Sequence, residues 1–299
     1  MVTELVLADI AALRDAALIN DARVRSVTGD LAQGLAGGLL NGVDGVFHLA
    51  AAVSGECEAD IDVGLKANLD TTRALLGACR AQANVTTAPR LVFSSSLAVY
   101  GGVMYGGPDV IADNTLPQPQ NSYGTQKFIC EQLIADYTRK GYIDGRSVRL
   151  PTVTVRPGKP NKAASGFMSG IIREPLAGVD AVCPVDPATG VWITSPRYAV
   201  AGLIAAYDTP REQWGGRTAM NLPGLSVRVA EMIEALERRA GATVAARVRV
   251  QKDETISSIV GGWPWRFDTA RARGLGLSGP AAMDEIVAEY VEDYPEAVG

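Results

Sequence analysis

The stretch that predicts the fold runs Arg90-Leu91-Val92-Phe93-Ser94-Ser95-Ser96-Leu97-Ala98-Val99-Tyr100-Gly101. It begins with a short apolar run of the kind found in buried strands, and serines follow directly. In a doubly wound parallel sheet, ligands bind at the carboxyl ends of the strands. The stretch therefore predicts a buried strand whose end presents hydroxyl groups to a ligand.

Three similar apolar segments precede this strand in the chain. We expect strands over residues 5–8, 24–27 and 45–49, with helices over Asp60–Ala81 and Ser122–Lys140. Short strands that alternate with longer helices predict an α/β fold, in which helices cover both faces of a parallel sheet.

The pattern changes in the second half of the chain. Residues 147–155 predict another strand, and Pro-Gly-Lys-Pro at 157–160 then interrupts the regular order. Further on we expect a helix over 227–240, a strand over 245–250 and a final helix over 283–294. We predict two units. The first is a domain over residues 1–158, to which residues 191–225 return, and the second is a smaller C-terminal lobe made of residues 159–190 and 226–299.

The composition favours a small-molecule partner. The 299 residues include 28 basic and 33 acidic ones, a formal charge of −5, without long runs of one sign, which argues against nucleic acid and anionic membranes. No apolar run approaches the ~20 residues that span a bilayer, and the N-terminus lacks a signal-peptide pattern. We therefore expect a cytoplasmic protein without a membrane partner.

The cysteines predict neither a metal site nor a disulfide framework. They share no metal-ligand spacing or close pairing, and they are Cys57, Cys79, Cys130 and Cys183. We expect each to be a small buried apolar residue in a reducing compartment.

Tyr123 and Lys127 stand four residues apart in a predicted helix, in Tyr123-Gly124-Thr125-Gln126-Lys127. Residues with this spacing lie one above the other on a helix face. A lysine ammonium near a phenol lowers the phenol pKa from about 10 toward the range of a general base. The same spacing also arises by chance on amphipathic helices. It therefore predicts a catalytic site only together with a second feature.

Ser96 is that second feature, because it lies at the carboxyl end of the predicted strand. A serine there can hydrogen-bond a substrate oxygen while Tyr123 moves its proton. The alternative is that Ser94–Ser96 only close a turn at a polar strand end. Taken together, Ser96, Tyr123 and Lys127 predict a single site for proton and hydride transfer.

The run Phe-Ser-Ser-Ser-x-x-Val-Tyr-Gly followed by Ser-Tyr-Gly-x-x-Lys resembles the active-site signature of extended short-chain dehydrogenase/reductases, the NAD-dependent epimerase/dehydratase family. The resemblance implies a Rossmann-like NAD-binding domain with a smaller substrate lobe. It also implies that Ser96, Tyr123 and Lys127 are catalytic, and that Tyr123 and Lys127 contact the cofactor as well.

The same resemblance implies a set of cofactor-binding residues. Asp9, at the end of the first visible strand, matches the acid that binds the adenosine ribose and favours NAD over NADP. The other cofactor contacts that it implies are Asp30 and Leu31 for adenine, Leu49, Ala50 and Ala51 beneath the pyrophosphate, Asn68 near the nicotinamide side, and Pro151 beside its ring. Asp30 could instead cap a helix, and we expect His48 to be packed below the site.

One departure from the family pattern stands at the start of the chain. The family opens with a strand and a Gly-x-x-Gly-x-x-Gly turn that receives the pyrophosphate, and this sequence begins beyond them. Gly34, Gly37 and Gly38 do not directly follow a strand and so do not replace that turn. We therefore expect the first strand and the glycine-rich loop to be missing, which would leave backbone groups of two neighbouring strands unpaired.

Within the family, the segment 149–167 resembles D-erythronate dehydrogenases, whereas Leu97-Ala98 replaces the acidic pair of nucleotide-sugar dehydratases. This resemblance implies NAD-dependent oxidation of D-erythronate at C2 to the 2-oxo acid. The substrate contacts that we expect are Arg173 and Arg197 for the carboxylate, with Ser54, Ser96 and Asn161 for hydroxyl groups. A nucleotide-sugar 4-epimerase and a catalytically silent dinucleotide sensor remain as alternatives, and a homodimer is the family-level expectation.

Overall fold

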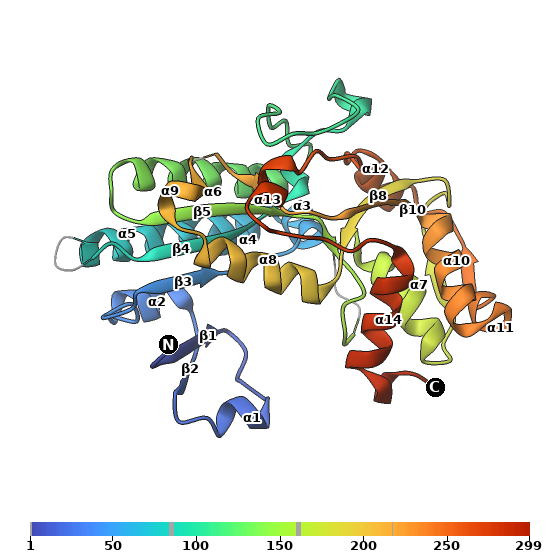
Figure 1. The fold of residues 1–299 in the computed structure, drawn as a ribbon, viewed down its shortest axis with the longest axis horizontal. Helices are drawn as coiled ribbons and strands as arrows, with labels where there is room; N and C mark the ends of the chain where they lie inside the picture. The colour runs from blue at the N-terminus through green and yellow to red at the C-terminus, as the bar shows by residue number, and fades with distance from the viewer. Residues whose placement is uncertain (1, 84–86, 160–162, 217) are drawn as a thin grey trace.

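A four-stranded parallel sheet lies at the centre of the N-terminal half (Figure 1). The computed structural model describes residues 2–83, 87–159, 163–216 and 218–299. The strands follow the order β3-β4-β5-β9, with β3 at Gly45–His48, β4 at Arg90–Ser96, β5 at Asp144–Leu150 and β9 at Met220–Asn221. The predicted strands over 45–49 and 90–93 are confirmed, and β4 continues to Ser96, which pairs with Leu150 of β5.

A second parallel pair is formed by β1 (Leu5–Asp9) and β2 (Val24–Thr28), with α1 (Ala16–Ile19) between them. These strands confirm the predictions over 5–8 and 24–27. The expectation of a missing first strand is not borne out: β1 is the first strand of the described residues and is paired with β2 from Leu5 to Asp9. The backbone of β1 bonds to β2, and that of β3 bonds to β4.

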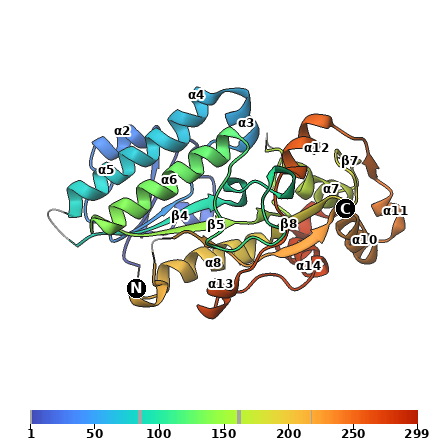
Figure 2. The ribbon, with the colours of Figure 1, turned by 90° about the horizontal axis from the view of Figure 1, so that it is seen from above.

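Helices cover both faces of the four-stranded sheet (Figure 2). α5 (Thr71–Ala83) and α6 (Ser122–Arg139) lie on one face, and α8 (Pro196–Asp208) packs against β4 and β5 from the other. This arrangement confirms the predicted doubly wound α/β architecture. The remaining helices around this sheet are α2 (Leu31–Ala36), α3 (Ser54–Ala59), α4 (Ile61–Gly64), α9 (Arg211–Trp214) and α13 (Ala270–Gly274), with 3-10 turns at Leu97–Val99 and Val103–Tyr105. A further 3-10 turn, Pro295–Ala297, follows the last helix at the C-terminus.

The helix predicted over Asp60–Ala81 differs from the structure in its middle. A π-helical segment, Leu65–Asp70, separates α4 from α5. Such segments occur mostly where side chains are re-aimed at functional sites, and this one contains the buried Asn68. Apolar periodicity does not distinguish a π turn from α-helix, so the sequence predicted one continuous helix.

The strand predicted over 147–155 is wrong in its second part. β5 ends at Leu150, where Pro151 offers no N–H to continue the ladder. The chain then crosses to another sheet, because β6 (Thr152–Val153) pairs with β8 (Gly190–Thr194). Similarly, the strand predicted over 245–250 begins later, with α11 at Ala242–Ala245 and β11 at Val248–Val250.

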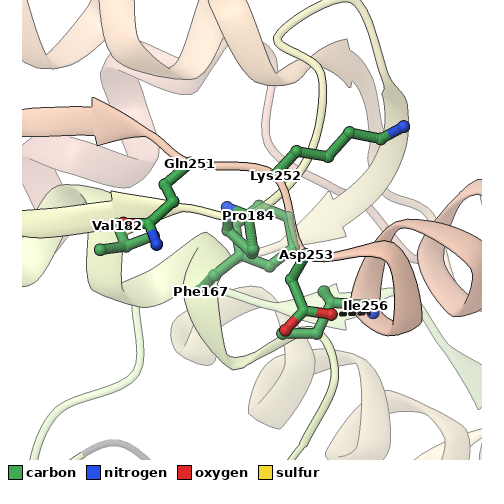
Figure 3. Close-up of a pocket in the computed structure, with 7 residues that line it drawn as sticks. All are labelled: Phe167, Val182, Pro184, Gln251, Lys252, Asp253 and Ile256. Atoms are coloured by element: carbon green, nitrogen blue, oxygen red, sulfur yellow. Dashed lines mark hydrogen bonds between the residues drawn. The ribbon is translucent and has the colours of Figure 1, made fainter.

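The C-terminal half contains two small sheets. β8 lies between β6 and the antiparallel β10 (Leu225–Arg228), and β7 (Ala181–Cys183) pairs with β11. A hollow of about 360 Å³ opens beside β7 (Figure 3). Its lining comes from α7 (Gly166–Leu176), from β7, and from the segment that leads into α12 (Glu254–Gly261), and the residues are Phe167, Val182, Pro184, Gln251, Lys252, Asp253 and Ile256.

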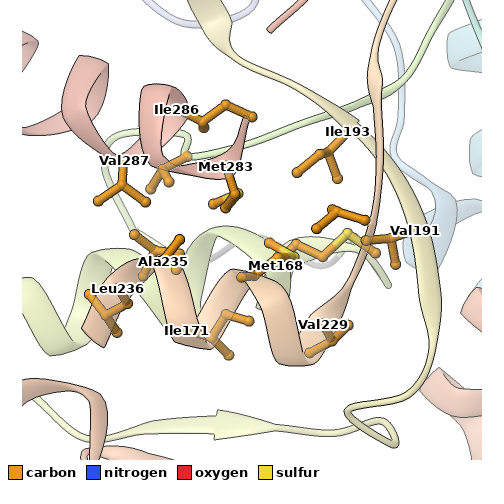
Figure 4. Close-up of a cluster of buried hydrophobic side chains, with 14 of the residues drawn as sticks. Met168, Ile171, Val191, Ile193, Val229, Ala235, Leu236, Met283, Ile286 and Val287 are labelled. Atoms are coloured by element: carbon orange, nitrogen blue, oxygen red, sulfur yellow. The ribbon is translucent and has the colours of Figure 1, made fainter. Parts of the chain in front are cut away.

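Three helices and β8 enclose the core of this half (Figure 4). The helices are α7, α10 (Val229–Ala240) and α14 (Met283–Asp293), so the predicted helices over 227–240 and 283–294 are confirmed. Figure 4 shows Met168 and Ile171 of α7 in one cluster with Ala235 of α10 and Met283 of α14. Burial of such side chains stabilises by about 25 cal/mol per Å² of apolar surface.

Residues 196–222 contribute to the sheet of the N-terminal half. Leu203, Ala206 and Leu222 pack in one buried cluster with Val92 of β4 and Val148 of β5. The predicted domain boundaries stay a prediction. In the described part of the chain, every helix is too short or too polar to cross a bilayer.

Candidate active site

Ser96 and Tyr123 meet at the carboxyl end of β4. The Ser96 hydroxyl is close enough to the Tyr123 phenol to lower its pKa, although β4 and α6 contribute the two side chains from separate parts of the sequence. Ser96 also accepts a hydrogen bond from the Ala98 N–H at 3.1 Å, which fixes its Oγ at the start of the following turn. Asn121 caps α6 by accepting from the Gly124 N–H, and this cap sets where Tyr123 enters the helix. The structure therefore places two of the three predicted catalytic residues next to each other.

Burial is the dominant influence on Tyr123. It raises the pKa of the phenol to about 12, against the opposing effects of the Ser96 hydroxyl and the Arg156 charge. The Arg156 charge acts to lower this pKa. Tyr123 is thus a neutral hydroxyl at pH 7, ready to exchange a proton through Ser96 or a bound substrate.

Lys127 lies one helical turn from Tyr123, as its spacing predicted, but its ammonium is directed toward the sheet. Nζ donates to the Ser94 carbonyl at 2.8 Å and lies 5.6 Å from the centre of the Tyr123 ring. Burial lowers the Lys127 pKa to about 8. Lys127 therefore ties α6 to the end of β4, and its effect on the Tyr123 pKa stays a prediction.

His48 lies beneath these residues at the end of β3. It is buried, and its Nε2 lies 2.8 Å from the Thr72 hydroxyl. Burial, with a smaller effect of the Lys127 charge, lowers its pKa to about 3, so the imidazole is neutral. These contacts agree with a packing role for His48 and give it no access to a substrate.

Asn68 connects the loop after β3 to α6. Its Oδ1 accepts from the Ala52 N–H at 2.8 Å, and its Nδ2 donates to the Gln126 side chain at 2.8 Å. Leu49, Ala50 and Ala51 precede this tether and are exposed. The π-helical turn that carries Asn68 thus holds the predicted pyrophosphate loop next to the helix of Tyr123.

A second hollow, of about 140 Å³, lies at the carboxyl ends of β1 and β2. Asp30 and Leu31 line it, with Gly29 and Gly34 beside them. Asp30 also caps α2 by accepting from two backbone N–H groups, so the alternative role considered for it is present as well. This hollow has the position expected for the adenine of a dinucleotide.

Asp9 ends β1 next to this hollow, opposite Thr28 of β2. The side chain is exposed, and Oδ1 accepts from the Ala11 N–H at 2.8 Å. The turn contact uses one carboxylate oxygen, which leaves the other to accept hydrogen bonds from a ribose.

Pro151 and Ser54 are two more of the predicted contacts. Pro151 is buried directly after β5, and Ser54, at the start of α3, accepts from the Ala164 N–H at 3.3 Å. This bond fastens the segment after β6 to the N-terminal half. Asn161 lies outside the described residues.

The two arginines predicted to bind the substrate carboxylate are both engaged with protein carboxylates. Arg197 lies at the surface, in ion pairs with Glu292 and Asp293 at 2.9 and 2.5 Å. Arg173 pairs with Glu174 at 2.5 Å and donates to the Arg156 carbonyl at 2.7 Å. The structure shows no contact of either guanidinium with Ser96 or Tyr123.

Arg156 is the residue near Tyr123 that the sequence analysis missed. It follows the buried Thr154 and Val155, close after β6. A charged residue directly after an apolar run, near a strand end, was the available signal. In the described part of the chain, no group of three or more histidine, cysteine or acidic side chains is arranged to hold a metal ion.

Comparison with known proteins agrees with this geometry. The family model described as the NAD dependent epimerase/dehydratase family matches residues 12–186. A D-erythronate dehydrogenase from Cupriavidus necator is 51% identical over 279 residues, 92% of this chain and 84% of the relative. Another D-erythronate dehydrogenase, from Haemophilus influenzae, is 41% identical over 293 residues, 97% of this chain and 90% of the relative.

The crystal structure of a nucleoside-diphosphate-sugar epimerase from Agrobacterium tumefaciens superposes with a TM-score of 0.91 at 42% identity, covering 99% of this chain and 86% of that chain. The superposition confirms the predicted Rossmann-like α/β fold. The family match spans more than half of the sequence, and both relatives extend over most of it. The chain therefore belongs to the NAD dependent epimerase/dehydratase family.

Proposed function

We propose that this enzyme oxidises D-erythronate at C2 to the 2-oxo acid, with NAD as hydride acceptor. The observation that carries the proposal is the neighbouring Ser96 and Tyr123 side chains at the end of β4, in a chain whose relatives are named D-erythronate dehydrogenases. The reaction converts hydroxy acid and NAD⁺ into oxo acid, NADH and one proton.

The chain's own residues handle the proton and the orientation. Ser96 holds the substrate hydroxyl. Tyr123 first gives up its own proton to solvent, and the phenolate then accepts the proton of the substrate hydroxyl as the C2 hydrogen leaves as hydride. NAD, when bound, supplies the acceptor for that hydride. Lys127, fixed on the Ser94 carbonyl, supplies positive charge below Tyr123 and, in our proposal, donates to the nicotinamide ribose.

The cofactor is NAD, and the described residues fit it. We propose that the 140 Å³ hollow with Asp30 and Leu31 receives adenine, and that Asp9 accepts the ribose hydroxyls. Leu49, Ala50 and Ala51 would then lie under the pyrophosphate, Asn68 toward the nicotinamide, and Pro151 beside its ring. This order follows the carboxyl edge of the strands from β1 to β5.

Replacing Asp9 with alanine should reduce the preference for NAD over NADP by at least tenfold. A 2′-phosphate at roughly 4 Å from a carboxylate costs about 4 kcal/mol per charge pair before screening, at an effective dielectric of 20. A tenfold preference corresponds to about 1.4 kcal/mol. Measuring kcat/KM for both cofactors checks this, with Glu4→Ala, just before β1, as the control. An unchanged ratio in Asp9→Ala would remove Asp9 from the ribose site.

A nucleotide-sugar epimerase is the second candidate, because one similar solved structure carries that description. The two functions differ in what binds and in whether NADH accumulates. We expect D-erythronate to raise the Tm of the NADH-bound protein and to yield NADH in the presence of NAD, and UDP-sugars to do neither. Stabilisation and epimerisation of a UDP-sugar, without NADH release, would favour the epimerase instead.

We also propose that the protein is a cytoplasmic homodimer. Within each subunit, residues 159–190 and 226–299 would form the substrate lobe. The dimer proposal rests on apolar residues that α4 and α6 expose. The exposed fractions are 57% for Ile61, 47% for Val63 and 37% for Ile129. Contiguous apolar surface of this kind marks protein interfaces.

The double variant Ile61→Lys, Val63→Lys should shift the protein from dimer to monomer, since charges at the centre of an apolar interface are costly to desolvate. Light scattering after size-exclusion chromatography measures the mass. Val200→Lys, which changes an exposed side chain on α8, is the control and should remain dimeric. A wild-type monomer would refute the proposed assembly.

A further inference from the structure

Arg156 is held by its backbone at the edge of the Tyr123 site. Its N–H donates to the buried Ser169 hydroxyl at 3.1 Å, and its carbonyl accepts from Arg173 at 2.7 Å. The segment that follows returns to α3, where the Ala164 N–H bonds to Ser54. These tethers fix the position of Arg156 and leave its side chain as the adjustable part.

The Arg156 guanidinium has no carboxylate partner. Among the described residues no acidic oxygen lies within the ion-pair distance of it, whereas Arg173 beside it is paired with Glu174. The residues outside the described ranges, at positions 1, 84–86, 160–162 and 217, include no Asp or Glu. A half-buried cation without a counter-ion is uncommon in proteins, because desolvation of the charge is not offset.

The guanidinium is also close enough to Tyr123 for the two groups to influence each other. Burial lowers the pKa of Arg156, and the Arg173 charge acts in the same direction, while Tyr123 opposes both. The reciprocal effect on Tyr123 is that the Arg156 charge acts to lower its pKa. An anion bound to the Arg156 guanidinium would therefore lie close to the hydroxyl that exchanges the proton.

We propose that Arg156 binds the carboxylate of the 2-hydroxy acid substrate while Ser96 and Tyr123 hold the adjacent hydroxyl. The proposal rests on the proposed function and names the group that makes the site selective for acids. In a 2-hydroxy acid the carboxylate carbon is bonded directly to the reacting carbon, so its binding group must adjoin the proton acceptor. A guanidinium offers two parallel N–H donors that match the two carboxylate oxygens.

The test compares an acid with its neutral amide. Steady-state kinetics with NAD would use D-erythronate and D-erythronamide on wild type, Arg156→Gln, Arg156→Lys and the surface control Arg197→Gln. We expect Arg156→Gln to lower kcat/KM for the acid by about 10- to 100-fold, the range of a charged hydrogen bond, and to change that for the amide by less than about threefold. Arg156→Lys should restore part of the acid activity, because it keeps the charge without the fork.

A binding measurement supplies a readout independent of turnover. D-Erythronate added to the NADH-bound protein should raise the Tm of wild type and of Arg197→Gln, and should fail to do so in Arg156→Gln. The KM for NAD should stay the same in all variants. Equal losses on acid and amide, unchanged acid kinetics in Arg156→Gln, or a selective rise in the KM for NAD would each overturn the assignment of Arg156.

The wild-type measurements separate this inference from the proposed function. If wild type does not oxidise D-erythronate but oxidises another 2-hydroxy acid, the proposed substrate is wrong. The effect of Arg156→Gln on the ratio of kcat/KM for that acid to kcat/KM for its amide then decides the role of Arg156. If wild type oxidises D-erythronate and Arg156→Gln leaves the ratio of kcat/KM for the acid to kcat/KM for the amide unchanged, the proposed function stands and the role assigned to Arg156 is refuted. If wild type uses no hydroxy acid, both are refuted.

Discussion

Tyr123→Phe should lower kcat for D-erythronate oxidation by about 10²- to 10⁴-fold, the range for loss of a positioned general base. The substitution removes the phenol hydroxyl, whose pKa Ser96 influences, and leaves the ring in place. Because little binding surface changes, the Kd for NAD should stay within about twofold of wild type. Stopped-flow or steady-state kinetics, together with calorimetric NAD titration, measure the two quantities.

Tyr142→Phe is the matched control for this variant, since Tyr142 packs against Tyr137 beyond the end of α6 and contacts none of the site residues. It should retain wild-type kinetics. Wild-type kcat in Tyr123→Phe would show that another group takes the proton. A large loss of NAD affinity in that variant would mean that the phenol hydroxyl serves cofactor binding.

Glu131→Ala should have the largest effect on stability, lowering the free energy of unfolding by about 3–5 kcal/mol. Glu131 on α6 pairs with Arg149 on β5 at 2.7 Å, with both side chains almost fully buried. It also accepts from the Ser95 hydroxyl, next to Ser96. Removing the carboxylate leaves the Arg149 charge buried with its remaining neutral partners, among them Tyr100. Urea unfolding measures the loss.

Asp136→Ala is the matched control, because Asp136 lies on the same helix in an exposed ion pair with Arg139. Exposed pairs contribute at most about 1 kcal/mol, so this variant should remain close to wild type. The double variant Glu131→Leu, Arg149→Met should recover part of the loss, since it leaves no buried charge behind. Equal effects of Glu131→Ala and Asp136→Ala would contradict a structural role for the buried pair.

The sequence was sufficient to predict the strands of the first half and the chemistry of its central motif. Apolar runs of strand length predicted β1 to β4, and their carboxyl ends predicted where ligands bind. The i, i+4 spacing placed Tyr123 and Lys127 on one helix face. These features depend on a few neighbouring residues, so periodicity and local propensity are sufficient to find them.

Which arginines have a carboxylate partner could be learned only from the tertiary structure. Arg173 and Arg197 looked like substrate ligands in the sequence, yet helix packing gives them Glu174, Glu292 and Asp293 as partners. Arg156 gained its position beside Tyr123 only because the chain leaves β5 at Pro151 and crosses to a second sheet. Ion pairing depends on which elements come within a few ångströms of one another, and that distance is set by the packing of segments far apart in the chain.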